Sequence, residues 1–155
     1  MTPTILTIAE KKLIGIKSKM YRHEHQNIPV LWKQFMPRVK AIENRVNTEY
    51  IALQEYISPH VKDPFDIWAS VEVSDHNTIP EHMQPFTIAS GLYAIFVHKG
   101  MDAGKTYKMI LEDWLPQSEY QIDSRPHFQV MGERYSNGSA DSEEDFYVPI
   151  APIKN

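Results

Sequence analysis

"WLPQSEYQIDSRPHFQVMGERY" (residues 114–135) has the pattern of a helix end followed by the start of a β-strand. Before this stretch, apolar residues recur at positions i, i+3, i+4 and i+7, which is the spacing of one helix face: Tyr107, Ile110, Leu111 and Trp114. This pattern predicts a helix over 103–116, which Pro116 stops. After a polar loop, a strand is predicted over 127–135.

Outward from this stretch, one order of elements occurs twice along the chain. In the second half, a strand over 86–100 precedes the helix, Gly91 permits a bend in it, and a strand over 145–153 comes last. The first half shows a similar set: strands over 4–8 and 11–20, a helix over 28–46, and strands over 50–57 and 67–74. Pro37 should kink or interrupt the first helix.

The repeated order strand, helix, strand, strand predicts an α+β fold with two pseudo-symmetric halves and a cleft between them. A length of 155 residues and a hydrophobic content of 42% fit one domain over 1–155, with pseudo-repeats at about 1–80 and 81–155. No low-complexity linker divides the two halves.

The charge of the chain argues against nucleic acid as a direct partner. The net charge is −4, and the 16 basic and 20 acidic residues are mixed along the chain, so no basic stripe exists. The absence of cysteine excludes disulfides and thiolate catalysis. No segment approaches the roughly 20 apolar residues of a membrane span, and the first residues do not form a signal peptide. A cytoplasmic protein with no membrane partner is expected.

Motifs for metal or cofactor chemistry are weak. The two histidines of His23–His25 have no third ligand at a diagnostic distance, and exposed loop histidines are the commoner explanation. The acidic run 141–145 lacks the alternating spacing of a calcium loop and is interpreted as a solvated turn. No phosphate-binding loop and no GxSxG pattern occurs. Neither a metal nor a cofactor is expected.

Aromatic residues near the ends of elements are the candidates for a small-molecule pocket: Trp68, Tyr93, Trp114, Tyr120, Phe128 and Tyr147. For Trp114 and Phe128, a position in the core is the commoner explanation. Trp68 shares a strand face with Glu72, and a carboxylate beside an indole is suited to a cation. The alternative for Glu72 is an exposed strand residue paired with a lysine.

Six stretches of the chain, in this order and spacing, resemble the GyrI-like effector-binding domain, the small-molecule-binding module of AraC-type and MerR-type transcription activators. They are "EKKLIGI" (10–16), "LWKQFMPR" (31–38), "WASVEVSD" (68–75), "GLYAIFVHKG" (91–100), "WLPQSEYQIDSRPHFQVMGERY" (114–135) and "SEEDFYVPI" (142–150). The combination W-L-P-x-S-x-Y followed by R-P-x-F is the most specific part. The resemblance implies an antiparallel sheet of two strand-helix-strand-strand halves, with a ligand cleft between them.

One position departs from the family pattern. Members usually carry a glutamate directly after the phenylalanine of R-P-x-F, as a charged floor for cationic ligands or as an acid/base in hydrolases, and here it is Gln129. At about 4 Å and a dielectric near 20, the missing charge would be worth about 4 kcal/mol toward a cation, partly offset by desolvation. Three explanations stay open: a neutral ligand, another acid such as Glu133 or Glu72, or a natural or engineered replacement that disables the site.

The sequence thus predicts a free-standing domain that binds a small hydrophobic ligand, cationic or neutral, and acts as a sensor or a sequestering protein, with a separate regulator protein as a further partner. The predicted ligand-binding residues are Trp68, Glu72, Tyr93, Trp114, Phe128, Gln129 and Tyr147. A monomer or weak dimer is expected. The alternatives are a hydrolase of lipophilic or strained-ring substrates, using Tyr93 or Tyr147 with Glu133, and a gyrase-inhibitor-like binder of a protein partner.

Overall fold

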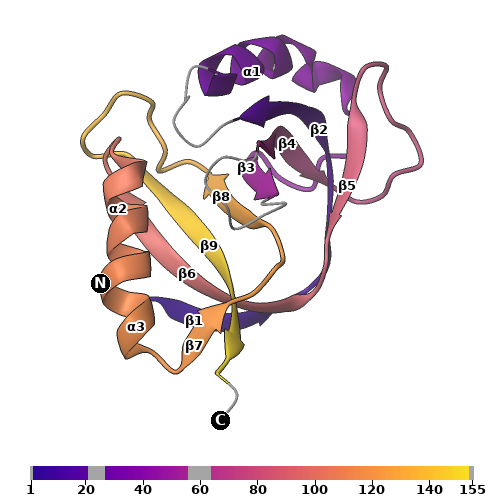
Figure 1. Ribbon diagram of the computed structural model, residues 1–155. Helices are drawn as coiled ribbons and strands as arrows, with labels where there is room; N and C mark the ends of the chain where they lie inside the picture. The colour runs from indigo at the N-terminus through magenta and orange to yellow at the C-terminus, as the bar shows by residue number, and fades with distance from the viewer. Residues whose placement is uncertain (1, 21–26, 56–63, 154–155) are drawn as a thin grey trace.

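The computed structural model describes residues 2–20, 27–55 and 64–153, and these form an α+β fold with a large antiparallel sheet (Figure 1). The strands are β1 (Thr4–Ile8), β2 (Lys11–Met20), β3 (Tyr50–Glu55), β4 (Phe65–Val73), β5 (Gln84–Ile88), β6 (Gly91–Lys99), β7 (Tyr120–Ile122), β8 (His127–Met131) and β9 (Glu143–Pro152). The predicted α+β class is confirmed. The His23–His25 motif and the end of the strand predicted over 50–57 lie outside the described residues.

The first helix is interrupted where Pro37 predicted it. α1 (Asn27–Phe35) passes directly into a 3₁₀ segment, η1 (Met36–Ala41), because proline has no N–H with which to continue the α-helical hydrogen bonds. The prediction that helix extends to residue 46 is wrong, since the chain is already extended at Ile42. That residue is nevertheless buried, so the apolar spacing continued beyond the helix itself.

The second helical stretch covers the range predicted for it, with a change of hydrogen-bond pattern inside. It runs through α2 (Ala103–Met109), a π-helical turn η2 (Ile110–Trp114) and α3 (Leu115–Gln117). Asp102 caps its start, where the carboxylate accepts a hydrogen bond of 3.1 Å from the Lys105 backbone N–H.

Several predicted boundaries in the second half differ from the structure. The strand predicted over 127–135 ends at Met131, and the strand predicted over 145–153 already begins at Glu143. The strand predicted over 86–100 is two strands, β5 and β6, which pair with different neighbours. Part of the predicted polar loop is the short strand β7, which pairs with β9. Three residues are too few for an alternation of apolar and polar side chains to be recognised in the sequence. The strand forms because it pairs with β9.

The strand order confirms the repeated pattern. It is β1-β6-β9-β8-β3-β4-β2-β5, with β7 beside β9. Each half contributes three central strands in mirrored order, and the halves meet where β8 pairs with β3, with Gln129 opposite Ala52. Figure 1 shows α1 beside β2, β3 and β4 of one half and α2 beside β6 and β9 of the other.

The sheet bends until its two ends come together. β1 is at one end of the strand order and β2 is next to the other end, yet only Ala9 and Glu10 separate them in the chain. Likewise, β5 at one end is joined to β6, next to the other end, by only Ala89 and Ser90. The bend encloses a core on the face away from the helices, which includes Leu13, Leu53, Ile88, Tyr93 and Phe128. Two further cores lie beneath α1 and beneath α2 and η2, on the other face.

Candidate functional site

A cavity of about 810 Å³ lies between α1 and α2, over the strands where the two halves meet. Trp32 of α1 and Tyr107 of α2 line opposite sides of it, and its floor comes from β3, β8 and β9. The lining is mostly apolar and aromatic, with a small number of polar side chains, which is the composition of small-molecule sites. The size is in the range that accommodates drug-sized ligands.

Gln129 lies on the floor of this cavity, on β8. Its amide is held by Gln54 of β3 through two hydrogen bonds: the Gln54 Nε2 donates to the Gln129 Oε1 at 2.9 Å, and the Gln129 Nε2 donates to the Gln54 Oε1 at 3.0 Å. Each amide thus donates one hydrogen bond to the other and accepts one from it. Each still has one N–H and one oxygen lone pair that are not used in this pair. A neutral, fixed amide pair therefore stands on the cavity floor.

A carboxyl group lines the same cavity from the neighbouring strand. Glu144 of β9 lies two residues before Phe146, which is paired with Gln129, so the two side chains point to the same face as the amide. Burial raises the pKa of Glu144 to about 7, and the nearby carboxylate of Asp145 adds to the rise. Among the described residues Glu144 has neither a hydrogen-bond partner nor an ion pair through its side chain.

Glu144 was not among the predicted site residues, since the acidic run 141–145 predicted a solvated turn. In the structure β9 begins at Glu143, and this places Glu144, Phe146 and Val148 on one face of the strand. The alternation Glu144, Phe146, Val148 was the signal that could have identified a carboxyl group facing inward.

Tyr107 contributes a second polar feature. Its hydroxyl is hydrogen-bonded to the Nδ1 of His127, which is buried on β8. The sequence pattern predicted Tyr107 only as one residue of an apolar helix face. Its contact with His127 connects α2 to β8, the strand that carries Gln129.

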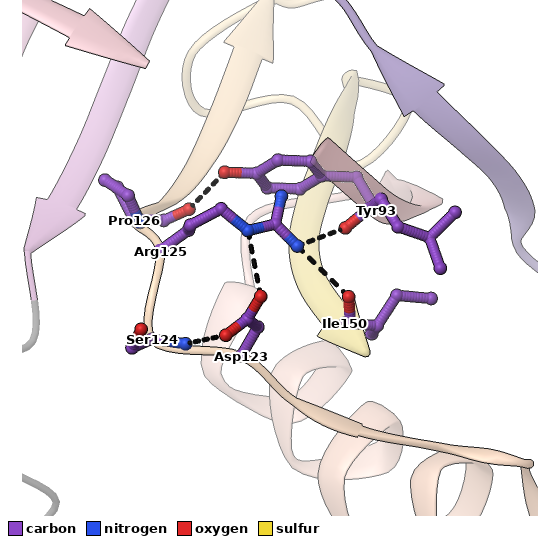
Figure 2. Close-up of polar contacts among 7 residues, drawn as sticks. Tyr93, Asp123, Ser124, Arg125, Pro126 and Ile150 are labelled. Atoms are coloured by element: carbon purple, nitrogen blue, oxygen red, sulfur yellow. Dashed lines mark hydrogen bonds and ion pairs between the residues drawn. The ribbon is translucent and has the colours of Figure 1, made fainter. Parts of the chain in front are cut away.

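Arg125 and Pro126, the R-P of the R-P-x-F motif, fix the path of the chain into β8, as Figure 2 shows. The Arg125 Nη2 donates to the backbone oxygens of Leu92 at 2.7 Å and Ile150 at 3.0 Å, and its Nε donates to Asp123 at 3.0 Å. Its guanidinium lies 4.7 Å from the centre of the Tyr93 ring. One side chain therefore ties β6 and β9 to the start of β8.

Comparison with known proteins gives the same assignment as these motifs. The GyrI-like small molecule binding domain matches residues 1–151. The chain belongs to the GyrI-like family. No curated protein matches it.

Solved structures share the GyrI-like fold at low sequence identity. SAV2435 bound to tetraphenylphosphonium is 18% identical, with a TM-score of 0.69 over 97% of this chain and 94% of that one. The EcmrR C-terminal domain is 13% identical, with a TM-score of 0.73 over 98% of both chains. A hydrolase encoded by lin2189 from Listeria innocua is 8% identical, with a TM-score of 0.57 over 97% of this chain and 92% of that one.

Two of the seven ligand-binding residues predicted for this GyrI-like protein line the cavity, Trp68 and Gln129. Trp68 is buried, and its Nε1 donates to the Glu55 carboxylate at 2.7 Å. Glu72 lies outside the lining and pairs with Lys11 at 3.3 Å, the alternative considered for it from the sequence.

The other four predicted residues are not part of the cavity lining and pack in the hydrophobic cores. Phe128 stacks on Tyr147 with 4.4 Å between ring centres, and Tyr93 packs edge-on against both, in the core on the face away from the helices. Trp114 packs edge-on against Phe96 at 5.1 Å, beneath the second helical stretch. Burial raises the pKa of Tyr93 to about 12.

No helix within the described ranges is long and apolar enough to cross a membrane.

Proposed function

We propose that this GyrI-like protein binds lipophilic aromatic small molecules in the cavity between α1 and α2, as a ligand sensor or a sequestering protein. The observation that carries the proposal is the cavity itself, about 810 Å³ in volume, lined by aromatic rings and a few fixed polar groups. The ligand described for SAV2435, tetraphenylphosphonium, is a bulky aromatic cation, and a molecule of this class suits such a lining.

Within this proposal, Trp32 and Tyr50 offer rings to the ligand, and Gln129 offers its remaining N–H and lone pair. Trp68 borders the cavity, but it is buried in the same core as Tyr93 and Phe128. Tyr93 and Tyr147, the tyrosines considered for a hydrolase, are not part of the lining. The proposal therefore favours binding over the hydrolase that the sequence left open.

The test is a fluorescence titration with two probes of similar shape: methyltriphenylphosphonium, a cation, and triphenylphosphine oxide, which is neutral. Trp32 and Trp68 line the cavity and act as reporters, and the Trp114→Phe background removes the emission of a tryptophan outside the lining. We expect saturable quenching by at least one probe.

Ala52→Trp provides the blocking variant, because Ala52 lies on the cavity floor opposite Gln129 and an indole there would fill the space. We expect it to weaken binding about tenfold or more, with the circular dichroism spectrum unchanged. Binding of neither probe, or equal binding by a folded Ala52→Trp variant, would contradict the proposed function.

A further inference from the structure

We propose that Glu144 of β9, and not position 129 of β8, supplies the charge that selects cationic ligands in this cavity, so that a cation binds with loss of the Glu144 proton. This inference rests on the proposed function and specifies the ligand class and its dependence on pH. It also chooses among the explanations that Gln129 left open, since the acid involved is neither Glu133 nor Glu72.

The first step is that the amide at position 129 cannot supply the charge. Gln129 is neutral, and its two hydrogen bonds with Gln54 hold it in one orientation. The pair joins strands from both halves of the sheet, because Gln54 is on β3 and Gln129 is on β8. The amide pair therefore serves as a fixed polar floor, and a cation would find no charge there.

The second step is that Glu144 is close enough to replace the missing charge. Phe146 is opposite Gln129 in the register of β8 and β9, and Glu144 is two residues before it on the same face. Such diagonal neighbours have Cα atoms about 7–8 Å apart, within reach of one ligand. Both side chains line the same cavity.

The third step is that no basic side chain of the described residues is paired with Glu144. The nearest basic side chain on the same hairpin, Arg134, is engaged by Glu143 at 2.8 Å and Asp145 at 3.0 Å. Asp145 raises the pKa of Glu144, as expected for a like charge. Among the residues that the structure describes, no ion pair involves Glu144.

The other titratable groups facing Glu144 come from three further elements. His98 of β6 is directly opposite in register, and its Nδ1 is hydrogen-bonded to Thr106 at 2.7 Å. Tyr135, in the loop before β9, has its pKa raised by burial and then by Glu144. Tyr107, bonded to His127, lines the cavity from α2, and the exposed Glu133 lines its edge. The buried Nε2 of His98 has no hydrogen-bond partner among the described residues, and none of these groups forms an ion pair with Glu144, so a ligand cation would supply its counter-charge.

The consequence is a proton-linked preference for cations. Near neutral pH part of the Glu144 population carries a proton, since its pKa is about 7. A bound cation favours the carboxylate, so the carboxyl O–H breaks and the proton passes to the buffer. Cation affinity should rise about tenfold between pH 6 and pH 8, following the ionised fraction, whereas the affinity for a neutral ligand should not rise.

The experiment measures the affinities of methyltriphenylphosphonium and triphenylphosphine oxide at pH 6, 7 and 8, with calorimetry at pH 7 in two buffers of different ionisation enthalpy. The variants are Glu144→Gln, Glu144→Asp and Glu133→Gln, the last being the matched control for a carboxyl group on the same cavity. Triphenylphosphine oxide affinity also reports whether each variant keeps its site.

We expect wild type and Glu133→Gln to show the pH-dependent rise and to release protons on binding the cation. Glu144→Gln should lose both effects while keeping oxide affinity, and Glu144→Asp should retain a pH dependence. A rise that persists in Glu144→Gln, or that disappears in Glu133→Gln instead, would overturn the inference.

Equal, pH-independent binding of both probes would also overturn it, but would leave the proposed function intact. Binding of neither probe would overturn the proposed function, and this inference with it.

Discussion

Arg125 shows how a single side chain can join several strands at one point. Its Nη2 bridges two backbone oxygens, from β6 and β9, while its plane covers the Tyr93 ring. A lysine has one point charge and no planar fork, so it could not make these contacts together. At Gly91, an added Cβ would lie 2.2 Å from the Arg125 Nη1, so the guanidinium can occupy this place only beside a glycine.

Tyr93 should contribute to the stability of the protein and not to ligand binding, because it lies in the core and not in the cavity lining. Its hydroxyl donates to the Pro126 oxygen at 2.9 Å, and the ring lies in the core on the face away from the helices. Tyr93→Phe should therefore lower the free energy of unfolding by about 1 kcal/mol and leave probe affinity unchanged. Urea unfolding and the fluorescence titration measure the two quantities. An affinity loss without a stability loss would instead place Tyr93 in contact with ligand.

The candidate site was only partly predictable at this scale. Gln129 stood out because it interrupts an apolar strand, and Trp68 because it shares a face with a carboxylate. Tyr93, Phe128 and Tyr147 have the same composition as pocket residues, yet the bend of the sheet encloses them in a core. Period-two alternation shows that residues share a face, but it does not show what covers that face.

Interruptions of the helices were easier to predict from the sequence than the pairing of the strands. Pro37 and Pro116 act through the lost N–H donor and steric hindrance, which depend on neighbouring residues alone. The division between β5 and β6 depends on partners at opposite ends of the sheet. β7 depends on β9, which follows it by some twenty residues in the chain. Sequence patterns carry little information on such distant partners.

The cap of α2 gives an element-scale prediction. Asp102 accepts the Lys105 N–H, and α2 carries Tyr107 to the cavity. Asp102→Ala should cost about 1 kcal/mol of stability, measured by urea unfolding, and should weaken binding of both probes because the helix start loosens. Asp102→Asn, which keeps an acceptor oxygen, is the matched control and should change both quantities little. Equal losses in the two variants would show that the carboxylate charge, not the cap, matters.

For the whole molecule, the raised pKa of Glu144 predicts a dependence of stability on pH. The unfolded chain loses this proton near the ordinary value of 4.5, whereas the folded protein keeps it up to about 7. The folded state thus binds more protons between these values, so its stability falls as pH rises through this window. Glu144→Gln should remove that fall, and its advantage over wild type should grow from pH 4 to pH 8.

Guanidinium unfolding at several pH values measures this difference, and the contributions of other titrating groups largely cancel between the two proteins. A constant offset between wild type and Glu144→Gln across the whole range would show that Glu144 ionises alike in both states.

The bend of the sheet has a last consequence for the two repeats. β1, from the first repeat, completes the edge beside β6 of the second, and β5 completes the edge beside β2 of the first. Each half therefore contributes one edge strand to the other half of the sheet. We therefore expect that the pieces 1–80 and 81–155 would not fold separately, since each would leave an unpaired edge and half of a shared core. The cavity lies where β3 and β8 join the two halves, so its floor is built from both.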